Sequence, residues 1–418
     1  MMSTASVPKI AYIMSRFPKL TETFILYEIL ALEKLGVSVE VYPLLRTHQS
    51  VTHPEAEAMV KRAHFHSFLS WSILYANWYF IRHSPRAYMR VWMEALRGTW
   101  GSINFFIGAL GILPKTVCFA YEMRRAGITH VHAHFATHPA LAGLIIYRLT
   151  GIPFSFVAHG SDLHVDRRML DRKIATAAFT ITVSAYNKAL MVQECGEEMS
   201  DKIHIIHCGI DPTVFVSHRK HCTGKPFRIL CVGSFEEVKG HTYLIEACRI
   251  LRDRGIEVSC HLVGDGPRRR ALEAQIQQGA LQHQVQIHGG LPRAGVVAML
   301  KQADVVVLAS VPTSNGKREG IPVSLMEAMA CAVPVISSDM ASIPELVESG
   351  RNGLLVPPRD ANALADTLQI LRDDEVLRTQ LGRAGRETVL QDFNLHKNTL
   401  ALLQLCQKDA HHVEDPHP

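Results

Sequence analysis

The sequence predicts an α/β protein with two doubly wound parallel-sheet domains. Short apolar segments typical of buried strands alternate with longer segments of helical periodicity, and this alternation restarts more regularly at Phe227. The length of 418 residues exceeds one ordinary core and suits two to three domains. We therefore predict an N-terminal domain over 1–216, a C-terminal domain over 217–392, and a closing helix and tail over 393–418.

The first half opens with a strand, a helix and a second strand. The strands cover 9–15 and 37–44, and the helix runs from about Thr21 to Leu35. Thr21 suits the N-cap position, and Gly36 follows the helix as a common terminating residue. Further strands are predicted at 129–135, 153–160, 179–184 and 202–209.

Residues 61–120 do not fit this alternation. They contain all four tryptophans of the chain, and Arg82, Arg86 and Arg90 follow one another at four-residue spacing. On one helix these arginines form a basic stripe beside an aromatic face, which suits an anionic membrane surface. An internal helical hairpin with solvated arginines explains the pattern equally well. The apolar stretch 103–113 falls short of the roughly 20 residues that span a bilayer, so no transmembrane helix is predicted.

The second half repeats the strand and helix alternation. Residues 216–226 are polar and basic and form the predicted domain linker. Predicted strands lie at 228–233, 258–264, 284–289, 304–310 and 334–339. Predicted helices lie at 240–254, 267–278, 293–302, 322–332, 360–373, 375–391 and 396–408.

Composition narrows the class of protein. An apolar content of 47% with 20% charged residues indicates a packed globular chain. The net charge of +5 is too weak over this length to indicate a nucleic-acid partner. The nine cysteines form no CxxC pair and are predicted to be reduced. Because the N-terminus lacks the pattern of a secretory signal, we expect a cytoplasmic protein.

The segment 314–339 has the strongest functional pattern. Glu319 and Glu327 lie eight positions apart around a helix start that Gly320 and Pro322 mark, with Pro322 expected in the first turn. The free N–H groups of a helix start favour a phosphate or diphosphate. Carboxylates on either side accept hydrogen bonds from sugar hydroxyls. This layout predicts a sugar-nucleotide site.

Other candidates lie in loops that follow strands, where ligands bind in open α/β sheets. Lys239 precedes Gly240 at a helix start and is placed to neutralise a departing diphosphate. Gly264 and Gly289 fit a tight turn and a ligand contact equally well. His159 ends a strand, where a neutral imidazole can donate to a sugar hydroxyl or help to stabilise charge during transfer.

Two histidines and the start of the first helix each have two possible interpretations. His132 and His134 lie on one strand face, but a metal site needs further ligands, so a hydrogen-bonded pair is the preferred interpretation. Thr21 and Glu22, at the first helix start, are placed to approach a phosphate or an acceptor. Helix capping explains them almost as well.

Several motifs together resemble a known family over nearly the whole chain. EGIPVSLMEAMACAVPVISS is similar to the E-x7-E element of the family-4 retaining glycosyltransferases of the GT-B fold, and VGSFEEVKGHTYLIEA to their phosphate-binding element. CGIDPTVF resembles their interdomain turn. SRFPKLTETFI, HVHAHFA and FVAHGSD resemble the branch that makes colanic acid and exopolysaccharides. The resemblance implies two Rossmann-like domains facing a cleft, with C-terminal helices returning to the N-terminal domain.

The resemblance also implies roles for individual residues. Glu319 would bind the hydroxyls of the donor sugar, Glu327 the ribose hydroxyls and Lys239 the diphosphate. His159 matches the cleft histidine of the family, and we assign catalytic roles to His159, Glu319 and Lys239. The predicted donor contacts are completed by Gly320, Val323, Ser324, Ser234, Gly264 and Gly289.

Two features depart from the family pattern. Ser234 stands where the family often has arginine, so a phosphate partner must come from elsewhere, and Arg318 and Lys317 are candidates. FPKLTETF replaces the usual glycine-rich first loop. On the acceptor side we predict Thr21, Glu22 and Asp162.

The expected reaction moves a sugar from a nucleoside diphosphate, UDP or GDP, to a hydroxyl group with retention and without a metal or other cofactor. The expected acceptor is a saccharide or polyprenyl-linked saccharide in cell-surface polysaccharide assembly, used at the inner face of the plasma membrane. A sugar-nucleotide 2-epimerase is one alternative, although the E-x7-E layout disfavours it. A noncatalytic sugar-nucleotide or glycan-binding module is another, and Ser234 gives it some support.

Overall fold

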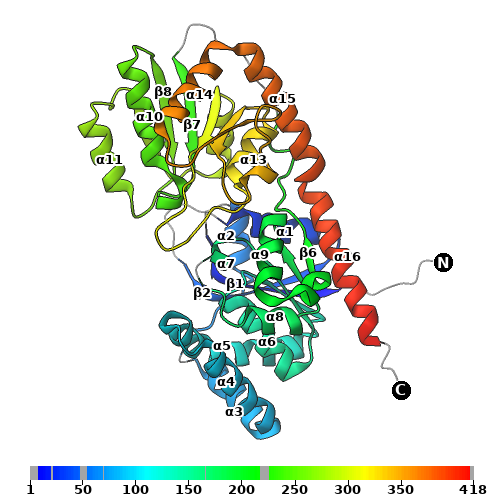
Figure 1. Cartoon of the computed structure of the whole chain (residues 1–418). Helices are drawn as coiled ribbons and strands as arrows, with labels where there is room; N and C mark the ends of the chain where they lie inside the picture. The colour runs from blue at the N-terminus through cyan, green and yellow to red at the C-terminus, as the bar shows by residue number, and fades with distance from the viewer. Residues whose placement is uncertain are drawn as a thin grey trace, which may run out of the picture. The chain divides into compact units, whose positions relative to one another are not determined.

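The computed structural model describes residues 8–19, 22–47, 54–68, 70–164, 166–216 and 226–414. The chain divides into two compact units (Figure 1). The first comprises Met1–Ile206 with the chain from Lys397 onward, and the second comprises His207–His396. Thr21 and residues 217–225 of the predicted linker lie outside the described residues.

The first unit contains a six-stranded parallel sheet in the order β2-β1-β3-β4-β5-β6. Its strands are β1 (Lys9–Phe17), β2 (Ser38–Arg46), β3 (His130–His134), β4 (Phe154–Ala158), β5 (Phe179–Thr182) and β6 (Ile203–Ile205). The flanking helices are α1 (Thr23–Lys34), α2 (Pro54–Val60), α6 (His138–Thr150), α7 (Ser161–His164), α8 (Leu170–Thr176) and α9 (Ala185–Cys195). The central strands β3, β4 and β5 are buried throughout, as is typical of a parallel sheet covered on both faces.

Most of residues 61–120 belong to three consecutive helices, the last of which ends at Ala126. These are α3 (Trp71–His83), α4 (Pro85–Thr99) and α5 (Ile103–Ala126). The single arginine stripe predicted there is wrong, because Arg82 belongs to α3 whereas Arg86 and Arg90 belong to α4. The chain breaks between the helices at Ser84, since Pro85 starts a new helix and disfavours helical backbone in the residue before it.

Helix α5 contains the apolar stretch 103–113 and extends beyond it. The helix runs past this stretch through Pro114 and ends at Ala126, giving 24 residues. By length and composition it is the one helix in the described part of the chain that could cross a bilayer, but 50% of its most apolar window is buried inside the unit. A core helix of a soluble domain meets the same criteria, so α5 gives only weak support for a membrane span.

The second unit contains a parallel sheet in the order β12-β11-β10-β7-β8-β9. This order is that of the doubly wound dinucleotide-binding folds. The strands are β7 (Phe227–Val232), β8 (Val258–Val263), β9 (Val285–Gly289), β10 (Val305–Leu308), β11 (Val335–Ser338) and β12 (Leu354–Val356). The helices are α10 (His241–Asp253), α11 (Arg269–Gln278), α12 (Arg293–Leu300), α13 (Val323–Ala330), α14 (Ala361–Asp373) and α15 (Glu375–Asp392).

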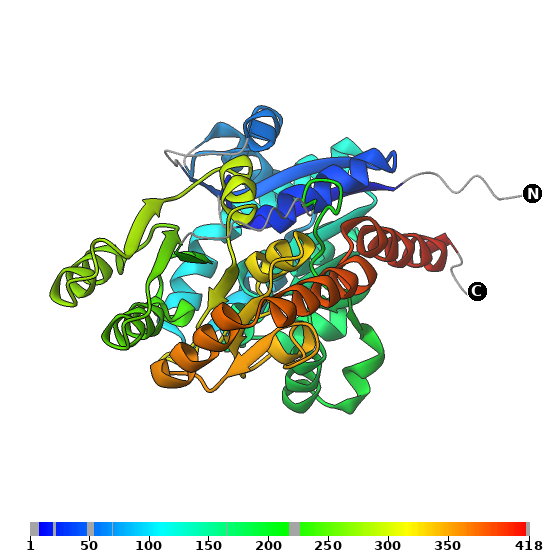
Figure 2. The ribbon, with the colours of Figure 1, turned by 90° about the horizontal axis from the view of Figure 1, so that it is seen from above.

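The last helix, α16 (Leu395–Glu414), returns to the first unit from Lys397 onward. It is the red helix that follows α15 in Figures 1 and 2. Leu402 and Cys406 on this helix are buried. The predicted architecture of two doubly wound parallel sheets with a returning C-terminal helix is confirmed.

Candidate functional site

Two predicted residues of the second unit lie in direct contact. The sheet order reverses between β7 and β10, and ligands of open α/β sheets bind outside the carboxyl ends of strands at such a point. Lys239 lies in the loop after β7, and Glu319 lies between β10 and α13. The Lys239 Nζ is 2.8 Å from the Glu319 Oε2, and the two side chains are 20% and 12% exposed. The fold therefore brings a cation and a carboxylate together at the switch point.

The loop after β7 packs closely against the backbone at the ends of β8 and β10, and this packing positions Lys239. Gly240 has a φ of +66°, and a Cβ atom there would lie 1.6 Å from the carbonyl oxygen of Ala309. A Cβ at Gly264 would lie 1.9 Å from the carbonyl oxygen of Gly233. A side chain at either position would thus push the loop after β7 away from the end of β10 or β8. Gly264 has this structural reason to be glycine, and its ligand contact remains a prediction.

Helix α13 leaves a narrow face open beside the pair. Its buried side chains are Leu325, Met326 and Ala328–Ala330, whereas Val323, Ser324 and Glu327 are partly exposed. These three positions share one face, because residues three and four apart are neighbours on a helix.

The start of α13 also presents backbone donors. Pro322 occupies the N-cap rather than the first turn, so the helix begins one residue later than predicted. Among the described residues no acceptor is found for the N–H groups of Val323 and Ser324. The open face therefore offers free N–H groups and, one turn on, the carboxyl group of Glu327.

Glu327 has a perturbed carboxyl group. Burial raises its pKa from 4.5 to about 7, and the guanidinium group of Arg293 partly opposes this rise. Near neutral pH the side chain is therefore divided between the acid and the carboxylate. Such a group can both accept and donate hydrogen bonds to paired hydroxyls.

The raised pKa gives Glu327 a pH-dependent effect on stability. Between 4.5 and about 7 the folded state binds more protons than the unfolded state, so the free energy of unfolding falls as pH rises. Glu327→Gln should therefore raise the melting temperature above pH 7 by several degrees and leave it unchanged below the unfolded pKa. Differential scanning fluorimetry across pH measures this effect. The exposed Glu257→Gln is the control, and a Glu327→Gln offset that is independent of pH would contradict the assignment.

Other predicted donor contacts lie in neighbouring loops. Lys317, a candidate for the missing phosphate partner, forms an ion pair with Glu236 in the loop after β7. Arg318 is exposed, and Ser234 is partly buried after β7. Gly289 ends β9, and its carbonyl oxygen accepts from the N–H of Gly264 at 2.9 Å. The roles of these residues in donor binding remain predictions.

The first unit has a second cluster at the ends of its strands. His159 follows β4, and its Nε2 lies 3.1 Å from the Nδ1 of His134 on β3. The Nε2 of His134 in turn lies 3.1 Å from the Oε1 of Glu28, which also accepts from the Tyr12 hydroxyl at 2.7 Å. Burial lowers the pKa of His134 to about 3 and that of His159 well below 6.5, so both rings are neutral.

Glu28 was not predicted as a site residue. It is a charged residue on α1 between the buried Leu26 and Ile29, a position where an unpaired carboxylate is costly. This isolation within an apolar helix was the signal that the sequence offered. Its histidine partners, His132 and His134, come from β3, and a helical pattern does not reveal them.

The cluster also bears on metal binding. Ligand atoms of Glu28, His132 and His134 all lie within 4.8 Å of one another, so the structure supplies the third ligand that the sequence could not place. Hydrogen bonds already engage most of these atoms, including His132 Nδ1, which lies 2.8 Å from the Ser155 hydroxyl. The His132 Nε2 is 3.9 Å from Glu28 and has no hydrogen-bond partner within the described ranges. The arrangement fits the preferred interpretation of hydrogen-bonded histidines.

The predicted acceptor-side residues have structural partners. The carboxylate of Asp162 accepts from the backbone N–H groups of His159 and Gly160 at 2.9 Å and of Ala136 at 2.6 Å. It thereby fastens the loop after β4 to the end of β3. Glu22 is at the N-cap position of α1, makes no side-chain cap, and pairs with Lys19 at 2.5 Å. Acceptor contacts by Asp162 and Glu22 remain predictions, and Thr21 lies outside the described residues.

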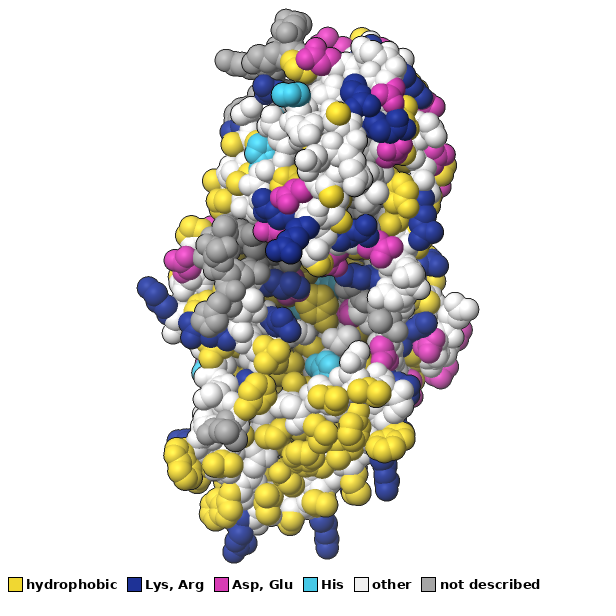
Figure 3. Space-filling model, turned by 90° about the vertical axis from the view of Figure 1, so that its left-hand side faces the viewer, with side chains coloured by type: hydrophobic (Ala, Val, Ile, Leu, Met, Phe, Trp, Pro, Cys, Tyr) yellow, Lys and Arg dark blue, Asp and Glu magenta, His cyan; other side chains and the backbone are white. Residues whose placement is uncertain are grey.

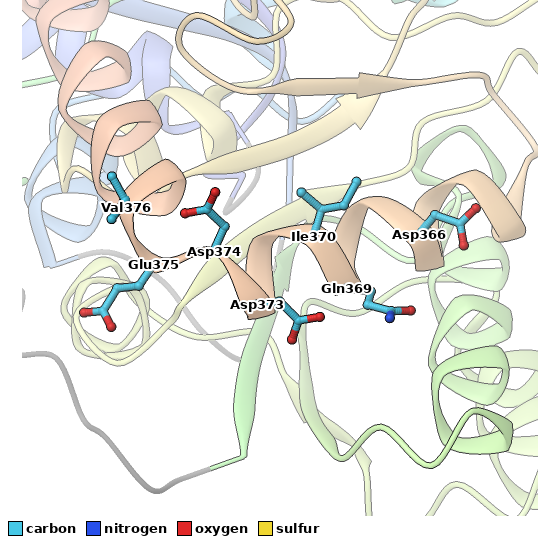
Figure 4. A pocket seen from close by; sticks show the side chains of 7 residues that line it. All are labelled: Asp366, Gln369, Ile370, Asp373, Asp374, Glu375 and Val376. Carbon is cyan, nitrogen blue, oxygen red and sulfur yellow. The ribbon is translucent and has the colours of Figure 1, made fainter.

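A pocket elsewhere in the second unit contains none of the predicted residues. It lies at the corner between α14 and α15, where the side chain of Asp374 accepts from the N–H of Leu377 and caps α15 (Figure 4). The lining side chains are Asp366, Gln369, Ile370, Asp373, Asp374, Glu375 and Val376. An open pocket rich in carboxylates disfavours a diphosphate ligand.

Family models match both halves of the chain. The model of Glycosyltransferase Family 4 matches residues 21–214, and the model of Glycosyl transferases group 1 matches residues 217–388. WcaL of Salmonella typhimurium, named for colanic acid biosynthesis, is 30% identical over 96% of this chain and 99% of its own length. The amylovoran biosynthesis glycosyltransferase AmsK of Erwinia amylovora is 32% identical over 73% of this chain and 78% of its own.

Solved structures share the fold at low sequence identity. A glycosyltransferase from Rickettsia africae superposes with a TM-score of 0.70 at 16% identity, covering 96% of this chain and 98% of its own. Anabaena HepE in complex with UDP has the same TM-score at 15% identity, covering 96% and 100%. These likenesses confirm the GT-B architecture.

Proposed function

This chain belongs to the family-4 glycosyltransferases with a group 1 C-terminal domain, and we propose that it transfers a sugar from a nucleoside diphosphate to a hydroxyl group with retention of anomeric configuration. It is a glycosyltransferase of the kind used in exopolysaccharide biosynthesis, as the names of its relatives indicate. The acceptor in this proposal is a saccharide or a polyprenyl-linked saccharide in the cytoplasm.

The observation that carries the donor assignment is the contact between Lys239 and Glu319 beside the start of α13. A diphosphate placed there meets the Lys239 ammonium and the N–H groups of Val323 and Ser324, which stabilise negative charge. Glu319 and Glu327 then accept hydrogen bonds from the hydroxyls of the sugar and of the ribose.

The same groups favour departure of the leaving group. Charge on the diphosphate grows as the glycosidic bond breaks, so a fixed ammonium and helix dipole stabilise the transition state more than the bound donor. In this proposal these protein cations take the place of a metal ion. Glu319 holds a hydroxyl away from the anomeric carbon and is not assigned as a nucleophile.

The hydrogen-bond chain of the first unit gives His159 a defined proton arrangement. When Glu28 is ionised it can only accept, so the Nε2 of His134 carries a proton and donates to it. The Nδ1 of His134 then accepts from the Nε2–H of His159. We assign Glu28 and His134 as positioning residues that fix the ring and the tautomer of His159 during transfer.

Donor binding and turnover test the function. UDP or GDP should raise the melting temperature, because a ligand that binds only the native state stabilises it, and ADP serves as comparison. With the matching sugar nucleotide and a lipid-linked saccharide, a glycosylated product should form even in EDTA. Epimerised donor without an acceptor would instead identify a 2-epimerase, and donor binding without product would identify a binding module. Activity lost in EDTA and restored by zinc would assign the Glu28, His132 and His134 cluster to a metal.

A further inference from the structure

The helices α3, α4 and α5 carry an unusual amount of exposed apolar surface. Most of the exposed large hydrophobic side chains in the described part of the chain lie between Phe68 and Leu110. Figure 3 shows hydrophobic side chains gathered over the lower part of this face, with Lys and Arg side chains at its margin. Contiguous patches of this kind mark interaction sites, since soluble proteins rarely expose them. We call the exposed faces of these three helices the apolar helical surface.

Helix α3 has two distinct apolar faces. Ile73, Ala76 and Phe80 point into the unit and are buried. The opposite face exposes aromatic and aliphatic side chains at helical spacing, and Trp71 is 85% exposed. The exposed residues are Trp71, Leu74, Tyr75, Trp78 and Ile81. Because the inward face already supplies the core contact, the outward one is not needed for folding.

Helices α4 and α5 extend the surface. On α5, Ile103 is 78% exposed and Ile107 is 63% exposed, whereas Phe105 and Ala109, on the opposite side of the helix, are buried. On α4, Met89 and Met93 are exposed at one-turn spacing, and Trp100 follows the helix with 72% exposure. Each of the three helices thus has exposed apolar side chains on one face and buried apolar side chains on the opposite face.

The charges around this surface are positive. Arg82, Arg86, Arg90 and Arg97 are exposed on α3 and α4. The carboxylates in 70–126 are Glu94, which pairs with Arg148 at 3.3 Å, and Glu122, which pairs with His66 at 3.0 Å. Both carboxylates are therefore engaged, and the arginines give the surface a net positive margin.

We propose that the apolar helical surface docks on an anionic lipid bilayer, with the aromatic side chains in the headgroup region and the arginines on lipid phosphates. Exposed Trp and Tyr beside Arg is the combination that the membrane interface favours. A second copy of this chain would bring the arginine margins together, and like charges oppose such a contact. Helix α5 lies in the interface rather than across the bilayer, because its second half is packed in the unit.

Membrane docking also explains how the enzyme would reach a lipid-linked acceptor. This step, unlike docking itself, rests on the proposed function. A polyprenyl-linked acceptor keeps its chain in the bilayer, so an enzyme held at the surface meets it by diffusion in two dimensions. Transfer to a lipid-linked acceptor in vesicles should then depend on the surface, while transfer to a soluble acceptor should not. Binding to plain vesicles needs no substrate, so a failure of docking and a failure of glycosyl transfer are distinguishable.

Flotation with vesicles tests the proposal directly. The full chain should float with vesicles of phosphatidylcholine and phosphatidylglycerol, and less with phosphatidylcholine alone. Trp71→Ser with Trp78→Ser should lower the bound fraction at least roughly tenfold, and Arg82→Ala with Arg86→Ala and Arg90→Ala should remove the preference for anionic vesicles. Because these side chains are exposed, the variants should fold. Ile370→Ser with Val376→Ser, also exposed but in the second unit, should bind like the wild type.

The tryptophans supply a second readout. All four lie in 71–100, so emission excited selectively from tryptophan reports on this segment alone. It should shift to shorter wavelength when anionic vesicles are added and should be quenched by brominated lipids. Unchanged emission without flotation would overturn the proposal. A dimer that Trp71→Ser dissociates, with no vesicle binding, would also overturn it and identify a surface between copies.

Discussion

Lys239→Met is expected to lower kcat for glycosyl transfer by roughly 10²-fold, about 2.7 kcal/mol of transition-state stabilisation. The ammonium lies 2.8 Å from the Glu319 carboxylate at the switch point of the sheet, where the leaving diphosphate is proposed to bind. Its charge matters most when the glycosidic bond breaks, so kcat should fall more than the donor KM rises. Steady-state kinetics with the preferred sugar nucleotide measure this effect. Lys301→Met, an exposed lysine of the same unit, is the control.

The carboxylates of the same site give a matched comparison. Glu319→Ala and Glu327→Ala should each lower transfer at least roughly tenfold, about 1.4 kcal/mol, with the fold intact. Because Lys239 and Glu319 touch, their double variant should lose less than the sum of the single losses. Near-wild-type turnover in the Glu319 or Lys239 variant would contradict the donor assignment. Losses in the double variant that equal the sum of the single losses would contradict it as well.

His159→Ala is expected to lower transfer by roughly 10²-fold while donor binding in the second unit persists. His159 is held by His134, and His134 by Glu28, so Glu28→Leu should also lower transfer. Glu28→Gln keeps an acceptor oxygen for the Tyr12 hydroxyl and His134 and should retain more activity than Glu28→Leu. Transfer rates for each variant, with nucleotide binding measured in parallel, test whether Glu28 acts on transfer through His134 and His159.

A double variant separates positioning from damage to the fold. If Glu28 acts through His159, Glu28→Leu should add little to the loss in a His159→Ala background. The exposed His283→Ala is the histidine control. Full activity of His159→Ala, or equal losses from Glu28→Leu in both backgrounds, would contradict the role proposed for this chain of residues.

Much of the fold was readable because its signals are local. The near-continuous apolar runs at β4 and β10 predicted buried parallel strands, and the restart at Phe227 predicted a second sheet. Local signals also misled. The spacing of Arg82 and Arg86 indicated one helix, but Pro85 starts another.

The sequence by itself determined the two sheets, the helix start beyond Glu319 and the strand-end positions of Lys239 and His159. Each of these follows from residue types within a few positions of one another. Only the tertiary structure decided which distant residues meet. The Lys239 to Glu319 contact requires β7 and β10 to be neighbours, and the Glu28 cluster requires α1 to lie against β3. Strand order is set by packing between segments far apart in the chain, and no local periodicity records it.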